Sequence, residues 1–87
     1  MLASVIIPTY NRSDVIIRSL QTWAEQTLNT SEFEVIVVDN NSSDNSAELI
    51  QHFIADKPNF CYILETQKGS TNARHAGAAI AKSDILI

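Results

Sequence analysis

Three polar clusters in this sequence combine residue types that can bind a ligand. The first, Pro8 to Arg12, places a fixed backbone, a hydroxyl, an aromatic ring, an amide and a cation side by side. The second, Asp39 to Asp44, consists of Asp, Asn and Ser, and the third is Glu65 to Asn72. A nucleoside can be recognised by this mixture, because its base offers both a flat face and hydrogen-bonding edges.

Phosphate groups would have to be bound without the usual glycine-rich motifs. The sequence has neither Gly-x-Gly-x-x-Gly after its first apolar run nor a Walker-type Gly-x-x-x-x-Gly-Lys. Six Lys and Arg against ten Asp and Glu give a formal charge of -4, which argues against a nucleic-acid-binding surface. A bound diphosphate would therefore need a divalent metal, held by carboxylates at the end of a central strand.

Hydrophobic periodicity predicts the elements that position these clusters, in the order β-α-β-α-β-α-β. Strands are predicted at Ala3–Ile7, Phe33–Val38 and Phe60–Leu64. The first is a mainly apolar run without alternation, typical of a strand buried in a parallel sheet, and the second is β-branched at four successive positions from Val35 to Val38. Pro8 is expected to end the first strand.

Helical spacing predicts three helices between and after these strands. The first is capped by Ser13 or Asp14 and runs to about Thr27, with its buried face at Ile16, Leu20, Trp23, Ala24 and Leu28. The second follows a cap at Asn45 paired with Glu48, and ends before Pro58. The third is Ser70 to Ala81, with Ala73, Ala76, Gly77, Ile80 and Ala81 on one side.

The predicted fold is a Rossmann-like, three-layer α/β/α domain with a mainly parallel sheet, occupying residues 1–87. Ile85 to Ile87 is expected to begin a fourth buried strand, so we expect the chain to be the first part of a longer domain. Ligands of such sheets bind at the carboxyl ends of the strands, near the point where strand order reverses. The same three polar clusters lie there.

The two longest motifs, with a weaker third, resemble the family-2 glycosyltransferases, which have the GT-A fold. They are Ser4-Val5-Ile6-Ile7-Pro8-Thr9-Tyr10-Asn11-Arg12, then Val35-Ile36-Val37-Val38-Asp39-Asn40-Asn41-Ser42-Ser43-Asp44, and then Gly69 with Ala73-Arg74 and Gly77. The first two are roughly 30 residues apart, as one βαβ unit requires. The sequence departs from the family where Asn40 and Asn41 replace a frequent Asp and Gly, and where Lys82 replaces a Gly.

This resemblance implies an inverting transfer of a sugar from a nucleotide donor, typically a UDP-sugar, to a saccharide, lipid-linked or other hydroxyl acceptor. Pro8, Thr9 and Tyr10 match positions that flank the nucleoside. Asp39 matches the carboxylate that accepts a hydrogen bond from the base, Asn41 belongs to the same loop, and Arg74 matches a basic position near the nucleotide. The Mg2+ or Mn2+ ligands, the catalytic base and the acceptor site are expected beyond Ile87, so these residues alone are expected to be inactive.

Each candidate residue also has a purely structural interpretation. Asp39 could form an Asx-turn with Asn41, Tyr10 could pack on the first helix, and Arg74 could form a surface ion pair. Other residues are interpreted as surface charges or as structural and are left out of the site: Arg12, Lys68, His52, His75 and Cys61.

Alternatives for the whole chain are a non-catalytic nucleotide-binding module and a fragment that self-associates through exposed sheet edges. The single cysteine, and an apolar start too short for a signal peptide, favour a cytoplasmic location. Membrane association would then come only from a C-terminal part.

Overall fold

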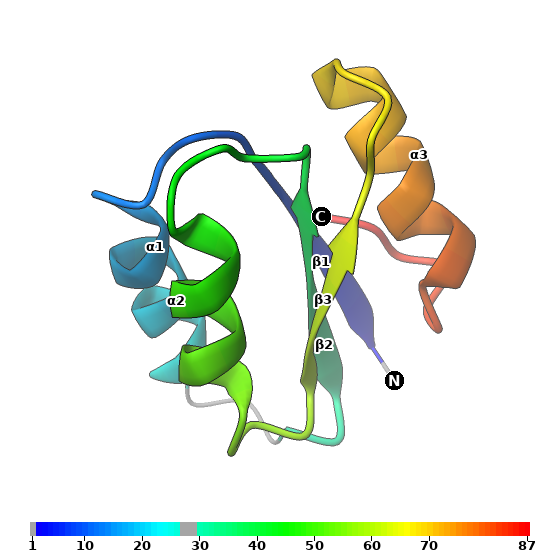
Figure 1. Cartoon of the computed structure of the whole chain (residues 1–87). Coiled ribbons are helices and arrows are strands. Elements are labelled where there is room, and N and C mark those ends of the chain that lie inside the picture. The colour runs from blue at the N-terminus through cyan, green and yellow to red at the C-terminus, as the bar shows by residue number, and fades with distance from the viewer. Residues whose placement is uncertain (1, 27–29) are drawn as a thin grey trace.

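The computed structural model describes residues 2–26 and 30–87, which form an alternating α/β unit. The elements are β1 (Ala3–Thr9), α1 (Ile16–Ala24), β2 (Phe33–Asp39), α2 (Ser46–Ile54), β3 (Phe60–Leu64) and α3 (Ser70–Ile80). Helices α1 and α2 cover one face of the sheet and α3 covers the other (Figure 1). The predicted three-layer Rossmann-like architecture is therefore confirmed. The predicted helix end at Thr27, and Leu28, lie outside the described residues.

The sheet is parallel, with β2 in the middle of the order β1-β2-β3. Val35 of β2 lies opposite both Val5 of β1 and Phe60 of β3. All seven residues of β2 are buried, which explains the run of apolar, β-branched side chains from Val35 to Val38.

The residues after α3 return to the outer edge of β1. The N–H groups of Ser4 and Ile6 donate to the carbonyls of Ile85 and Ile87, each at 2.8 Å. These residues thus begin a parallel pairing with β1, but they form only one isolated bridge, Ser4 to Leu86, and not a full strand. Ile85, Leu86 and Ile87 are also exposed, so the prediction of a buried strand is wrong. This return reverses the strand order at β1, which makes the carboxyl end of β1 the switch point of the sheet.

Pro8 does not end the first strand, contrary to the sequence-based expectation, and β1 continues to Thr9. The N–H groups of Ser4 and Ile6 point away from β2. Pro8 comes two residues after Ile6, so its backbone nitrogen points the same way. Its missing N–H therefore falls on the outer edge, and Pro8 still lies in register with Val38 of β2.

Two apolar cores hold the layers together. Ile16 and Leu20 of α1 and Ile50 of α2 pack on the first face of the sheet, whereas Ala73 of α3 packs on Ile6, Ile36 and Val38 on the other face. The small residues of α3 allow this helix to approach closely, and Gly77 is buried against Ile6. Helical spacing predicts Ile80 on the same face, but Ile80 is exposed, as is Ala24 of α1.

A buried carboxylate at the opposite end of the sheet anchors the returning segment. Glu34 Oε2 accepts hydrogen bonds from Ser4 Oγ and from the Lys82 N–H, both at 2.6 Å. Ser4 Oγ in turn accepts the Ser83 N–H at 3.1 Å. These bonds fix where the chain leaves α3 before it reaches β1. None of the helices in the described residues is long and apolar enough to cross a membrane.

Candidate functional site

Asn40 brings the three polar loops together at the carboxyl ends of the strands. Its N–H donates to the Thr9 carbonyl at 2.8 Å. Its side-chain amide donates to the carbonyls of Glu65 and Gln67 at 3.0 and 2.8 Å, and its Oδ1 accepts the Gly69 N–H at 2.9 Å. An aspartate could not donate to those two carbonyls, so the departure from the family's frequent Asp has a structural reason here.

A cavity of about 160 Å³ opens between these loops, lined by Pro8, Thr9, Tyr10, Asn40 and Ser70. Three of the predicted site residues, Pro8, Thr9 and Tyr10, are thus brought together. Tyr10 is 43% exposed, so its ring is available to a ligand. Asn40 and Ser70 are not among the predicted site residues, although both lie in loops that the switch-point rule selects.

Asp39 lies at the end of β2, in register with Thr9, and is only 1% exposed. Its Oδ1 accepts the Ser42 N–H at 2.9 Å and its Oδ2 accepts the Tyr62 hydroxyl at 2.8 Å. A turn at Asp39 is therefore present, but Ser42 donates to it instead of Asn41. Asn41 itself adopts a left-handed backbone with φ of 66° and is exposed. A carboxylate has about four acceptor positions, so these two bonds leave capacity for a ligand N–H.

Tyr62 is a supporting residue that the sequence interpretation missed. Burial, and then its hydrogen bond to Asp39, raise the pKa of Tyr62 to about 12. The phenol therefore stays a neutral donor at physiological pH and holds the Asp39 carboxylate in place. The available signal was a tyrosine inside an apolar strand, whose hydroxyl needs a buried partner.

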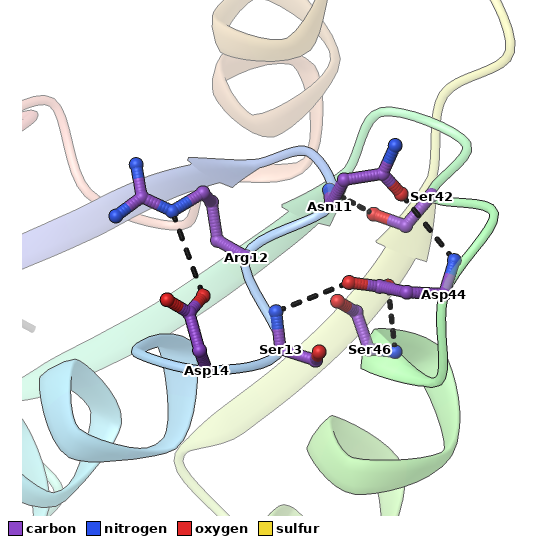
Figure 2. Close-up of polar contacts among 7 residues, drawn as sticks. All are labelled: Asn11, Arg12, Ser13, Asp14, Ser42, Asp44 and Ser46. Carbon is purple, nitrogen blue, oxygen red and sulfur yellow. Dashed lines mark hydrogen bonds and ion pairs between the residues drawn. The ribbon is translucent and has the colours of Figure 1, made fainter.

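Side chains and backbone N–H groups join the loop after β1 to the loop after β2 (Figure 2). Asn11 Oδ1 accepts the Ser43 N–H at 2.7 Å, and the Asn11 N–H donates to Ser42 Oγ at 2.9 Å. Asp44 accepts the N–H groups of Ser13 and Ser46 at 3.2 and 3.0 Å. These contacts make the two loops one rigid rim of the site.

The cap position of α1 is Val15 and not Ser13 or Asp14, so that prediction is wrong, whereas Asn45 occupies the predicted cap position of α2 without making a side-chain capping bond. Asp44 takes the role at α2, because its carboxylate reaches the N–H of Ser46 and also that of Ser13. Hydrogen bonding from Ser46, with a smaller contribution from Ser13, lowers the pKa of Asp44 to about 2. The bridge therefore stays ionised at any pH well above that value.

The basic residues near the site occupy three different environments. Arg74 is exposed and lines a separate cavity of about 260 Å³ between α3 and the β1 edge, together with Ile6 and Leu86. Arg12 lies 3.8 Å from Asp14 on the surface, as expected for a surface charge. Lys68 is also predicted to be a surface charge, yet its Nζ donates to the Tyr10 hydroxyl at 2.6 Å and lies 4.0 Å from the ring centroid.

A larger cavity, of about 400 Å³, lies at the opposite end of the sheet and includes Glu34, Cys61 and Lys82 in its lining. We assign the site to the carboxyl ends despite this difference in size, because Glu34 is already bonded within the fold. Burial also raises the pKa of the Cys61 thiol, which makes it a poor nucleophile. Within residues 2–26 and 30–87, no group of three or more His, Cys, Asp and Glu side chains could hold a metal ion.

The layer order, the parallel sheet and the loops at its switch point define a Rossmann-like ligand-binding unit of the GT-A type. The chain belongs to glycosyl transferase family 2, whose family model matches residues 4–87.

Curated and solved relatives agree with this assignment. The chain is similar to validoxylamine A glucosyltransferase of Streptomyces hygroscopicus subsp. jinggangensis, with 36% identity over 87 residues that cover 98% of this chain and 20% of that protein. It is also similar to the mannosyltransferase PcManGT from Pyrobaculum calidifontis, solved with GDP-Man and Mn2+, with TM-score 0.89, 28% identity and coverage of 97% and 25%.

S. aureus TarS 1-349 in complex with UDP gives a TM-score of 0.87 at 30% identity and is matched over 100% of this chain and 26% of that chain. The chain therefore spans between 20% and 26% of the length of these three relatives.

Proposed function

We propose that this chain is the nucleotide-binding part of an inverting glycosyltransferase that moves a sugar from a UDP-sugar to a hydroxyl acceptor. The acceptor is a saccharide, a lipid-linked or another hydroxyl compound, and the reaction takes place in the cytoplasm. The observation that carries the proposal is the cavity between Pro8, Thr9, Tyr10, Asn40 and Ser70 at the carboxyl ends of β1 and β2.

Each wall of this cavity suits a different part of a nucleoside. The Tyr10 ring offers a face for a base. Asp39 does not line the cavity but lies in register with Thr9, and we assign its carboxyl group as the acceptor for the imide N–H of uracil. The hydroxyls of Thr9 and Ser70 offer polar contacts, and Thr9 Oγ1 is buried without a hydrogen-bond partner in the part of the chain that the structure describes. Arg74 and Asn41, which the resemblance also implicates, lie outside this lining and would act at its margins.

The chemistry of transfer is assigned to residues outside these 87. The described side chains form no metal-binding cluster, so none of them is given a catalytic step that uses Mg2+ or Mn2+. Support for a divalent metal comes from the Mn2+ in the PcManGT complex. We expect the metal ligands and the catalytic base to follow Ile87, and the 87-residue chain alone to show no glycosyl transfer.

Isothermal titration of the purified protein with UDP and CDP tests this function. We expect UDP to bind at least tenfold more tightly, since cytosine presents no imide N–H to Asp39 and leaves an acceptor facing an acceptor. Binding in EDTA shows the contribution of the protein alone, and Mn2+ should strengthen it only if metal ligands are present. Lys82→Met, at the opposite end of the sheet, is the control and should bind as the wild type does.

Failure of UDP to bind to a folded protein would contradict the proposal. Equal affinity for UDP and CDP would remove the assignment of Asp39 to the base. UDP binding by a full-length protein that transfers no sugar to any hydroxyl acceptor would instead support the non-catalytic module.

A further inference from the structure

Lys68 lies against Tyr10, a residue that lines the cavity, and has no carboxylate partner in the described part of the chain. Its ammonium group donates to the Tyr10 hydroxyl at 2.6 Å and lies 4.0 Å from the centroid of the same ring. Tyr10 in turn lines the cavity. The loop after β3 thus delivers a positive charge to the wall formed by the loop after β1, although the two residues are 58 positions apart in sequence.

The other cations near these loops are engaged elsewhere or face other surfaces. Arg12 lies near Asp14, and Arg74 lines the cavity beside Leu86. The nearest carboxylate on the loop of Lys68 is Glu65, which accepts the Gln67 N–H at 2.9 Å. Lys68 therefore keeps a charge that a neutral phenol hydroxyl satisfies only in part.

We propose that Lys68 binds the phosphate groups of the nucleotide whose base contacts Tyr10, an inference that rests on the proposed function. The ammonium group leaves the Tyr10 hydroxyl and donates to a phosphate oxygen, which is a stronger, charge-assisted hydrogen bond. Its flexible stem allows this exchange without movement of the backbone. Lys68 lies between Gln67, whose carbonyl accepts a hydrogen bond from Asn40, and Ser70, which lines the cavity. This position keeps Lys68 close to the cavity.

The local potential supports an anion at this place. Helix α3 begins at Ser70, two residues after Lys68, and its first turn contains no acidic residue. The start of a helix is favourable to negative charge, so α3 adds to the attraction that Lys68 supplies. In a chain with a formal charge of -4, this is a localised positive feature and not a general property of the surface.

Titration of uridine, UMP and UDP into the wild type, Lys68→Met and Lys68→Arg separates the phosphate contact from other effects. The buffer contains EDTA and little salt, because salt screens an exposed ion pair. We expect Lys68→Met to bind UDP about tenfold more weakly and uridine equally well. Lys68→Arg should retain most of the UDP affinity, and Lys82→Met controls for the change in net charge.

Two results would overturn the inference while leaving the nucleotide site in place. In the first, Lys68→Met binds UDP as tightly as the wild type. In the second, it loses uridine and UDP affinity by the same factor, which would mean that Lys68 acts only by orienting Tyr10. A folded wild type that binds neither uridine nor UDP would overturn this inference and the proposed function together.

Discussion

Replacement of Gly77 by alanine should lower the free energy of unfolding by about 1–2 kcal/mol, although the same change in an exposed helix would stabilise it by about 1 kcal/mol. A Cβ atom at Gly77 would lie 2.6 Å from Ile6 Cγ2 and 3.3 Å from Val38 Cγ2. Ile6 is β-branched and buried in β1, so its Cγ2 cannot rotate away cheaply. Helix α3 must then move off the sheet, and with it Ser70 of the cavity wall.

A double-mutant cycle with Ile6→Ala identifies the cause of this loss. Ile6→Ala alone should cost about 2–5 kcal/mol, but it removes both Ile6 atoms that the new Cβ would meet. In that background Gly77→Ala should become neutral or stabilising, so the effect changes sign. Thermal unfolding followed by circular dichroism measures this, since 1 kcal/mol shifts Tm by roughly 4–8 °C in a chain of this size.

Ala79→Val is the matched control for the cycle, because Ala79 is exposed on the same helix. It should lower the free energy of unfolding only by the poorer helix propensity of valine, about 0.6 kcal/mol, with and without Ile6. If Gly77→Ala destabilised the protein equally with and without Ile6, the close contact between α3 and β1 would not explain the glycine.

Replacement of Asp39 by asparagine should weaken UDP binding about tenfold or more and reduce the preference for UDP over CDP. The remaining Oδ1 can still accept the Ser42 N–H, but the new amide nitrogen takes the place of the oxygen that faces Tyr62. A donor there opposes the imide N–H of uracil and suits the acceptor N3 of cytosine. The ratio of the two affinities therefore reports base recognition separately from any loss of stability.

Tyr62→Phe distinguishes a direct contact from support within the fold. It removes the hydroxyl that donates to Asp39 but leaves the carboxylate charged. We expect a smaller loss of UDP affinity than in Asp39→Asn, with the preference for UDP retained. An Asp39→Asn protein that unfolds more easily yet keeps the wild-type ratio of UDP to CDP affinity would show that Asp39 has a structural role only.

The order of the elements and the general place of the site can be predicted from this sequence because both depend on strong local patterns. The apolar, β-branched run at Val35 to Val38 is typical of a strand buried on both faces, and β2 proves to be the central strand. Parallel pairing then places the ends of β1 and β2 together, so Thr9 and Asp39 lie opposite each other in register. These conclusions need only the order of strands and helices along the chain and the pattern of apolar residues within them.

The sequence interpretation fails where a contact between distant loops decides the outcome. Asn45 has the spacing of a helix cap, but it is the Asp44 carboxylate that accepts the Ser46 N–H at the start of α2. The same carboxylate accepts the Ser13 N–H from the loop after β1, a contact that the local sequence does not reveal. Lys68 resembles any surface lysine until the loop after β3 is placed over Tyr10. Pro8 could be placed inside β1 only once it was known that its backbone nitrogen faces the outer edge of the strand. Local propensity carries no information about such long-range partners.

A nucleotide should bind at the carboxyl ends of the parallel strands, and amide chemical-shift mapping during a titration with UDP would locate it. The predicted result is that the largest shifts fall on Tyr10, Asn11, Asn40, Gly69 and Ser70, around the 160 Å³ cavity. Shifts concentrated instead on Glu34, Cys61 and Lys82, around the 400 Å³ cavity at the other end of the sheet, would contradict this placement of the nucleotide.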